Sequence, residues 1–222
     1  TWARNIESRM TMTTPLLEVK GLKAGYGRAE VLHGLDLQAA PGSVITVIVP
    51  NGAGKSTLLN ALMGVLPTKS GQVTVAGNDV TRDESFRRVA KGIAYVPQGR
   101  MIFPTLSVEE NIQTGLENSR DRTVPDEIYA LFPVLFDMKR RKGGNLSGGQ
   151  QQQLAIARAL VTNPKVLLLD EPTEGIQPSI IKDIAKALNE IRKMKGITIV
   201  VSEQVLSFAM DVADRLFVIE GG

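Results

Sequence analysis

Residues 44–57, VITVIVPNGAGKST, place two glycines, a lysine and two hydroxyls directly after an apolar run. Gly52 and Gly54 let backbone N–H groups approach phosphate oxygens, and the helix expected after them offers its positive N-terminal end. Lys55 would reach the outer phosphates of a nucleotide, and the Ser56 hydroxyl would bind Mg²⁺. The spacing therefore predicts a phosphate-binding loop. Its expected members are Asn51, Gly52, Ala53, Gly54, Lys55, Ser56 and Thr57.

A second group is a pair of adjacent carboxylates in VLLLDEP, where the apolar run 166–170 ends. A carboxylate at the end of a buried strand is costly to leave unpaired, and Asp170 avoids that cost if it faces Mg²⁺ through the water shell of the ion. Glu171 would then orient or deprotonate the water that attacks a phosphate. Such a pair is common in turns after strands, but behind a phosphate-binding loop it indicates nucleotide hydrolysis.

A third group, Ser147, Gly148 and Gly149 in NLSGGQQQQLAIARAL, stands at the start of an expected helix. A hydroxyl and bare backbone at a helix N-terminus can bind an anion, although an ordinary Ser/Gly helix cap has the same composition. One nucleotide needs only one phosphate-binding loop in each chain. A second anion site therefore predicts that two copies face each other, each completing the site of the other.

The composition limits the remaining chemistry. The chain has no cysteine and one histidine, His33, which excludes disulfides and thiolate metal sites and nearly excludes histidine-based catalysis. Apolar residues make up 43%, enough for a sizeable core, and no apolar run approaches the about 20 residues of a membrane span. The 26 basic and 23 acidic residues leave a net charge of +3, too small an excess to indicate a nucleic-acid partner.

Several segments are predicted as strands that position these groups. Residues 16–22 and 30–38 alternate between apolar and polar side chains, as strands of an antiparallel sheet do. Residues 44–49, 166–170 and 197–203 are continuous apolar runs, typical of parallel strands buried on both faces. Helical patterns follow each of these runs. We therefore expect an α/β fold with a parallel sheet and an N-terminal antiparallel β region, and a ligand site at the C-terminal ends of the parallel strands.

The middle of the chain differs, because residues 107–141 have a helical pattern without strands. Ser107 and Glu110 match a capping box at the start of the first helix. This region is interpreted as a helical lobe inserted into the α/β core. A further helix is predicted between the second and third apolar runs, where apolar residues recur at helical spacing: Ile180, Ile181, Ile184, Leu188 and Ile191.

We expect one domain over residues 16–222. Residues 16–98 and 163–222 would form its α/β core, and about residues 99–162 would form an inserted helical subdomain that carries the third group. Residues 1–15 lack the apolar core of a signal peptide and are interpreted as a tail or a cloning remnant.

The order of the motifs is similar to that in the ATP-binding subunit of ABC transporters, with LSGGQ at residues 146–150 between the phosphate-binding loop and LLLDEP. The resemblance covers the chain after Pro15 and implies a P-loop NTPase core that binds and hydrolyses ATP with Mg²⁺. It also implies that Tyr26 in AGYG stacks on adenine. Gln98 in AYVPQGR would contact Mg²⁺ and the attacking water and relay the nucleotide state to a membrane partner.

The resemblance implies partners as well. Ser147, Gly148 and Gly149 would contact the γ-phosphate held by a second ATPase subunit, identical or different. The two ATPase subunits would close around ATP and open on hydrolysis, and the permease subunits would follow this movement. A solute-binding protein would act indirectly. The protein would then be cytoplasmic and peripheral on the inner face of the plasma membrane.

Two stretches narrow the resemblance. VPQGRMIFPTLSVEENI and DEPTEGIQPSII resemble the ATPase subunits of branched-chain amino-acid importers, and the region from LFPVLFDM to PSIIKDI is closest to their urea and short-chain amide relatives. ATPase subunits do not touch the cargo, so the substrate follows from association with these relatives only. The expected substrates are branched-chain amino acids, urea or short-chain amides.

Three residues depart from the family pattern. Val49 takes the place of the first glycine of the loop. A positive φ there would strain valine, whereas valine is favourable if it is the last extended residue of the strand; we expect ATP binding to be weakened rather than abolished. Gln204 takes the place of the switch histidine, as is frequent in this importer group; it can donate a hydrogen bond to a γ-phosphate but cannot carry a proton. Gln177 stands where many ABC ATPases have an acid, so it receives no catalytic role.

The family usually continues beyond LFVIEGG, and we expect a truncated or disordered tail.

Two other functions fit parts of the sequence. A soluble ABC ATPase acting on nucleic acid or ribosomes usually has two cassettes or a long coiled coil, whereas the interval from Lys55 to Leu146 fits only a compact helical lobe. The basic run KRRKGG at residues 139–144 is interpreted as a solvated loop. A nucleotide-binding module that no longer hydrolyses is suggested by Val49 alone. It is opposed by the presence of Lys55, Gln98, Asp170 and Glu171.

A docking area for the membrane partner is expected beside Gln98, over Gly99 and Arg100 and the apolar residues Met101, Ile102 and Phe103. If exposed, the three apolar side chains would form a patch that requires a partner. The alternative is that they pack beneath the helical lobe.

Overall fold

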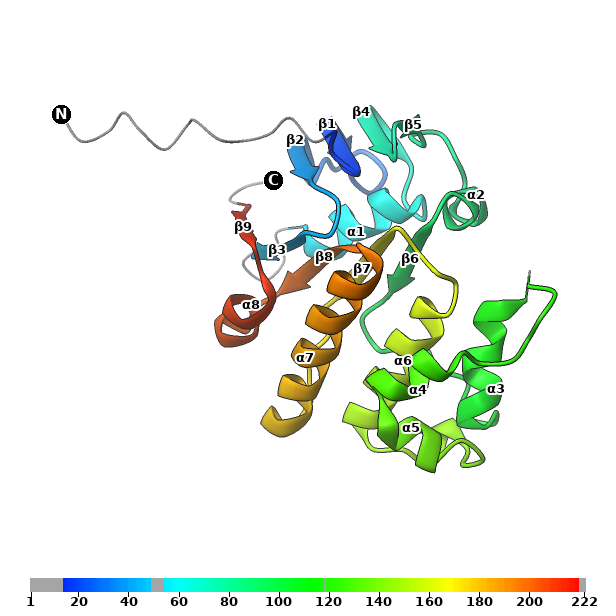
Figure 1. The fold of residues 1–222 in the computed structure, drawn as a ribbon. Coiled ribbons are helices and arrows are strands. Elements are labelled where there is room, and N and C mark those ends of the chain that lie inside the picture. The colour runs from blue at the N-terminus through cyan, green and yellow to red at the C-terminus, as the bar shows by residue number, and fades with distance from the viewer. Residues whose placement is uncertain (1–13, 49–53, 118, 220–222) are drawn as a thin grey trace.

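The computed structural model describes residues 14–48, 54–117 and 119–219. Two sheets lie beside each other, and a lobe of short helices extends from one side of the parallel sheet (Figure 1). This arrangement confirms the predicted α/β fold with an antiparallel β region and a parallel sheet. None of the helices in the described ranges is long and apolar enough to cross a membrane.

The antiparallel sheet has the strand order β2-β1-β4-β5. Its strands are β1 (Leu17–Ala24), β2 (Leu32–Ala39), β4 (Thr68–Val75) and β5 (Asn78–Asp79). Val19 lies opposite Leu37 on one side and Val73 on the other, and all three are buried. The sequence predicted only the first two strands, because β4 contains polar residues at most of its positions and only Val73 and Val75 face the core.

The parallel sheet has the order β6-β7-β8-β3-β9. Its strands are β6 (Ile93–Val96), β7 (Val166–Asp170), β8 (Thr198–Glu203), β3 (Val44–Ile48) and β9 (Arg215–Val218). Every residue of β7 and β8 is buried, as the continuous apolar runs predict for strands covered on both faces. Asp170 pairs in register with Ser202, so the C-terminal ends of β7 and β8 lie side by side.

Four helices flank the sheets: α1 (Lys55–Met63), α2 (Ser85–Ala90), α7 (Pro178–Lys195) and α8 (Leu206–Val212). Helix α1 buries Leu58, Leu59 and Leu62 in a core that it shares with both sheets. Its C-terminal end is held by Arg88 of α2, whose side chain is 1% exposed. The Arg88 guanidinium donates to the carbonyl oxygens of Ala61 (2.8 Å) and Leu62 (2.7 Å).

The helical lobe contains α3 (Val108–Gln113), the 3₁₀ helix η1 (Thr114–Leu116), α4 (Asp126–Leu131), α5 (Pro133–Asp137), η2 (Gly143–Asn145) and α6 (Gly148–Leu160). The capping box at Ser107 and Glu110 is confirmed. The helical pattern predicted within residues 107–141 is confirmed, with α3 and η1 in its first part and α4 and α5 in its second. Pro133 starts a new helix, as its fixed φ and missing N–H favour.

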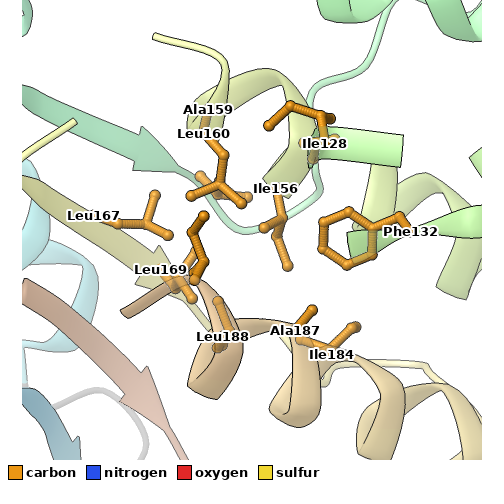
Figure 2. Packing of buried hydrophobic residues seen from close by; sticks show 14 of the residues in the cluster. Ile128, Phe132, Ile156, Ala159, Leu160, Leu167, Leu169, Ile184, Ala187 and Leu188 are labelled. Carbon is orange, nitrogen blue, oxygen red and sulfur yellow. The ribbon is translucent and has the colours of Figure 1, made fainter. Parts of the chain in front are cut away.

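One core joins the lobe to the parallel sheet. Figure 2 shows Ile156 of α6 between Phe132 at the start of α5 and Leu169 of β7, with Leu188 of α7 beneath. The spacing predicted for α7 is confirmed, since Ile184, Leu188 and Ile191 are buried and Ile180 and Ile181 are partly buried against the same core. Helix α6 thus links the third sequence group to both β7 and α7.

Candidate functional site

The predicted phosphate-binding loop falls between β3 and α1 in the sequence, and residues 49–53 lie outside the described ranges together with the Lys55 side chain. The predictions for Val49, Asn51, Gly52 and Ala53 therefore remain predictions. Gly54, the N-cap of α1, has a φ of 106°. A Cβ there would lie 3.0 Å from Val31 Cγ1, so both the backbone and the surrounding space require glycine.

Asp170 ends β7 with a side chain that is 3% exposed. Ser202 Oγ of β8 donates to Asp170 Oδ1 at 3.0 Å, and the Tyr95 hydroxyl of β6 lies 3.4 Å from Asp170 Oδ2. Burial, with the Asp170 carboxylate as a second cause, raises the pKa of Tyr95. The Tyr95 hydroxyl therefore stays protonated and can donate, and hydroxyl groups from both neighbouring strands orient Asp170.

The same tyrosine links Asp170 to α1. The Tyr95 hydroxyl lies 3.3 Å from Asn60 Oδ1, and Ser56 is one turn before Asn60 on the same face of α1. A buried carboxylate and a serine hydroxyl on neighbouring elements fit a Mg²⁺ ion that also binds water and phosphate oxygens. The described part of the chain contains no group of three or more His, Cys, Asp or Glu side chains that could hold a metal ion.

Glu171 and Gln204 are in contact, although 33 positions separate them. Gln204 Nε2 donates to Glu171 Oε1 at 2.7 Å, and the Glu171 backbone N–H donates to Ser202 O at 2.9 Å. Glu171 has a φ of 45°, in the left-handed region that non-glycine residues rarely adopt. Such backbone strain of about 1 kcal/mol or more concentrates at functional sites. The predicted base and the residue in the switch position therefore form one unit.

Gln98 lies just beyond β6, and its side chain points to the segment that follows Glu171. Gln98 Nε2 donates to Glu174 Oε2 at 3.0 Å, and an Arg100 guanidinium nitrogen donates to Glu174 O at 2.9 Å. Glu174, and Arg100 as its partner, have no role predicted from the sequence. No local motif signals this contact, because Gln98 and Glu174 are 76 positions apart.

Ser147, Gly148 and Gly149 stand at the N-terminus of α6, as predicted. Ser147 is the N-cap and forms a capping box with Gln150: the Gln150 N–H donates to Ser147 Oγ, and the Ser147 N–H donates to Gln150 Oε1. A Cβ on Gly149 would lie 2.8 Å from Ile180 Cγ2 of α7. The helix cap and the anion site are compatible, because the Ser147 hydroxyl accepts one hydrogen bond and can still donate its own hydrogen.

Two further predicted areas lie at the surface. Tyr26, between β1 and β2, is 55% exposed, so its ring is free to stack on a flat ligand. Met101 and Phe103 are 67% and 47% exposed, whereas Ile102 packs partly against the core. The exposed patch therefore has two apolar residues, not the expected three. The Arg158 guanidinium carbon lies 5.4 Å from the centre of the Phe103 ring, over its face.

The sequence model of the protein family described as "ABC transporter" matches residues 32–174 of the chain. The chain belongs to this family. It is an ABC transporter ATP-binding subunit and an ATPase, as the motif order predicted.

Two relatives of this ABC ATPase are both ATP-binding proteins of branched-chain amino acid transport. It is 40% identical over 200 residues to the high-affinity branched-chain amino acid transport ATP-binding protein BraG of Pseudomonas aeruginosa, covering 89% of this chain and 85% of the relative. It is 36% identical to the probable branched-chain amino acid transport ATP-binding protein LivF of Archaeoglobus fulgidus, covering 93% and 89%. These relatives confirm the predicted resemblance to the branched-chain importer group.

Solved structures agree with the ABC ATPase fold. A nucleotide-free ATP-binding cassette from an ABC transporter superposes with a TM-score of 0.80 at 30% identity, over 94% of this chain and 88% of that one. A dimeric cassette in a post-hydrolysis state, bound to ADP and Pi, has a TM-score of 0.81 at 26% identity, over 93% and 95%. Another cassette of this fold was solved in its ADP conformation, with a TM-score of 0.79. ATP binding by this chain follows from its family.

Proposed function

We propose that this ABC ATPase uses Glu171 as the base for ATP hydrolysis and powers an importer of branched-chain amino acids, urea or short-chain amides. The observation that carries the proposal is the convergence of Asp170, Glu171 and Gln204 where β7 and β8 end side by side. Tyr95 joins this group to α1, the helix that follows the phosphate-binding loop.

Nucleotide binding is assigned to the start of α1 and its preceding loop. Residues 51–57 would hold the phosphates, with Lys55 on the outer ones, and Tyr26 would stack on adenine. Bound Mg²⁺ would neutralise phosphate charge, and Ser56, Asp170 and Gln98 would hold it. In the structure Gln98 donates to Glu174, so it would have to exchange that partner to reach the ion.

Hydrolysis is assigned to Glu171 and Gln204. The Glu171 carboxylate would accept a proton from the attacking water and hold it at an Oε atom. Gln204 is an amide, so it orients Glu171 and can donate to a phosphate oxygen, but it cannot take up the proton. Of these two residues, only Glu171 would therefore take up the proton of the attacking water.

A second ATPase subunit, identical or different, would complete each site. Ser147, Gly148 and Gly149 would present their donors to the γ-phosphate held by that subunit, through the N-terminal end of α6. One structural relative is dimeric with ADP and Pi bound, which supports this arrangement. We expect no nucleic-acid partner.

Permease subunits are the proposed membrane partners, with a solute-binding protein acting indirectly. The exposed Met101 and Phe103 side chains, beside Gln98, supply an apolar docking surface. Residues 16–98 and 163–222 would act as the ATP-binding core, and about residues 99–162 as the subdomain that carries this surface. The protein would be peripheral on the cytoplasmic face of the plasma membrane, and the names of BraG and LivF support branched-chain amino acids as cargo.

The variant Glu171→Gln tests the assignment of the base. Steady-state ATP hydrolysis should fall at least about a hundredfold, because a general base contributes that much or more. ATP affinity should be retained, and ATP-bound dimers should accumulate in size-exclusion chromatography. Glu190→Gln on α7, an exposed residue, is the matched control and should behave as the parent protein does. Continued steady hydrolysis by Glu171→Gln would refute Glu171 as the base.

The cargo is tested separately. The ATPase is reconstituted with each candidate permease pair and solute-binding protein, and uptake of labelled leucine, urea and acetamide is measured. Leucine uptake that requires ATP supports the branched-chain assignment, whereas urea or acetamide uptake moves the protein to the other importer group. ATP-dependent uptake of none of the three by any pair would contradict the importer proposal.

A further inference from the structure

A buried carboxylate that the hydrolysis scheme does not use lies beside the site. Glu203, the last residue of β8, is 2% exposed, and Thr173, in the loop after β7, is 4% exposed. Thr173 Oγ1 donates to Glu203 Oε2 at 2.8 Å. The backbone N–H groups of Gln204 and Val205 both donate to Glu203 Oε1, at 2.7 and 2.9 Å. Three donors from two loops therefore converge on one carboxylate.

These bonds join the two loops that carry the catalytic contact. Thr173 lies two residues after Glu171, and Glu203 lies immediately before Gln204. The Gln204 side chain is exposed, so packing does not hold it in place. Its backbone, however, is fixed by Glu203, and Glu203 is fixed by Thr173.

We propose that Thr173 and Glu203 are positioning residues that hold Gln204 in hydrogen-bond contact with Glu171. This inference rests on the proposed role of Glu171 as the base. A buried polar pair that merely stabilised the fold would change the melting temperature and leave turnover of the folded protein intact. The positioning role instead predicts a loss of turnover that depends on Gln204.

The first test compares Thr173→Val with Thr173→Ser. Valine keeps the shape of threonine but removes the hydroxyl, so Glu203 loses a donor inside the protein. We expect kcat to fall about tenfold with the KM for ATP changed less than about twofold, because only the catalytic contact is displaced. Thr173→Ser keeps the hydroxyl and should restore most of the turnover. A kcat of Thr173→Val equal to that of the parent protein, measured well below its melting temperature, would overturn the inference.

A double-mutant cycle tests whether the effect passes through Gln204. In a Gln204→Ala background, Thr173→Val should no longer lower kcat, because the side chain that it positions is gone. The same tenfold loss in both backgrounds would show that Thr173 acts by another route and would contradict the proposal.

A readout without nucleotide completes the design. Amide hydrogen exchange at Gln204 and Val205 should be faster in Thr173→Val than in the parent protein and in Thr173→Ser, because the acceptor of these N–H groups is less firmly held. Unchanged exchange would overturn the inference. Glu171→Gln separates the two proposals: if it abolishes turnover while Thr173→Val does not lower it, only the positioning inference fails. If Glu171→Gln still hydrolyses ATP, the proposed function fails first.

Discussion

Helices α1 and α6 both begin at glycines that were expected to bind phosphate, yet their N-termini are built in opposite ways. Helix α1 starts after Gly54, which has a φ of 106° and no side chain with which to cap the helix. Helix α6 starts after Ser147, whose hydroxyl accepts the Gln150 N–H, and Gln150 caps the Ser147 N–H in return. Among the described residues the first helix has no side-chain cap, whereas the second satisfies part of its own terminal donors.

This difference separates two kinds of anion site. If the start of α1 binds phosphate as proposed, the ligand would satisfy its N–H groups, and this site should bind nucleotide strongly within one chain. The start of α6 is stable without a ligand and offers mainly the Ser147 hydroxyl and the backbone of two glycines. It therefore suits a phosphate that arrives and leaves with a second subunit. The predictions below test this contrast, from the largest expected effect to the smallest.

Gly54→Ala should have the largest effect. The new Cβ would lie 3.0 Å from Val31 Cγ1 and would occupy a backbone conformation that costs an L-residue about 1 kcal/mol or more. ATP affinity, measured by titration with a fluorescent ATP analogue, should fall more than about tenfold, because helix α1 and its donors would shift. Gly77→Ala is the control, since Gly77 also has a positive φ but open space around it. Unchanged ATP affinity in Gly54→Ala would remove the argument for a preset α1 terminus.

Gly149→Ala should act at the other terminus. Its Cβ would meet Ile180 Cγ2 at 2.8 Å and push α6 away from α7. ATP binding by the single subunit should be unchanged, while hydrolysis falls about tenfold because the second subunit is no longer engaged correctly. Gly148→Ala would meet only the flexible Arg100 guanidinium at 3.3 Å and should lose less activity. The contrast between the helices fails if Gly149→Ala weakens ATP binding as much as Gly54→Ala does.

Ser147→Ala and Ser107→Ala remove the same capping box at two helices, α6 and α3. Each should lower the free energy of unfolding by about 1 kcal/mol, as loss of a serine N-cap does. Only Ser147→Ala should also lower the rate of ATP hydrolysis, because only Ser147 is proposed to contact a phosphate. Equal hydrolysis rates in the two variants, with chemical denaturation showing equal stability losses, would reduce Ser147 to a helix cap.

The two capping boxes should also differ in acid. The Ser107 backbone N–H, which donates to Glu110, lowers the pKa of Glu110 below its ordinary value of 4.5. Glu110 therefore contributes stability above about pH 4.5, and that contribution is lost as the pH falls through the lower pKa of the folded state. Gln150 does not titrate, so the start of α6 should be unaffected. The NMR shift of the Ser107 N–H should change between pH 6 and 3, the Ser147 N–H should not, and Glu110→Gln should abolish the change.

Motifs confined to a few neighbouring residues could be predicted from the sequence. The Ser107–Glu110 box, the helix with Ile184 and Leu188, and the two carboxylates at the end of β7 each depend on local spacing, and the structure has them where expected. Family resemblance added Gln204, which the structure joins to Glu171. These features need no knowledge of which strands are neighbours.

Features set by strand order could not be predicted in the same way. Tyr95 and Ser202 orient Asp170 from 75 and 32 positions away, and no short pattern marks either residue. The pairing of β4 with β1 was missed because most β4 side chains are polar. Ile102 packs against the core while Met101 and Phe103 are exposed. The Asn111 side chain fixes the backbone here, because it accepts from the Phe103 N–H and donates to the Phe103 carbonyl oxygen. In each case the deciding contact is distant in sequence or lies in the backbone.

The buried Arg88 guanidinium has a consequence for the affinity of the nucleotide site. Helix α1 has nine residues, fewer than an isolated helix needs to persist in water. Arg88 binds the carbonyl oxygens at the far end of α1 and also those of Thr81 and Asp83, so fraying of the helix is suppressed from the end opposite the proposed ATP site. An incoming nucleotide then does not have to order the helix that binds it. The affinity gained by this preorganisation belongs to a side chain that never touches the ligand.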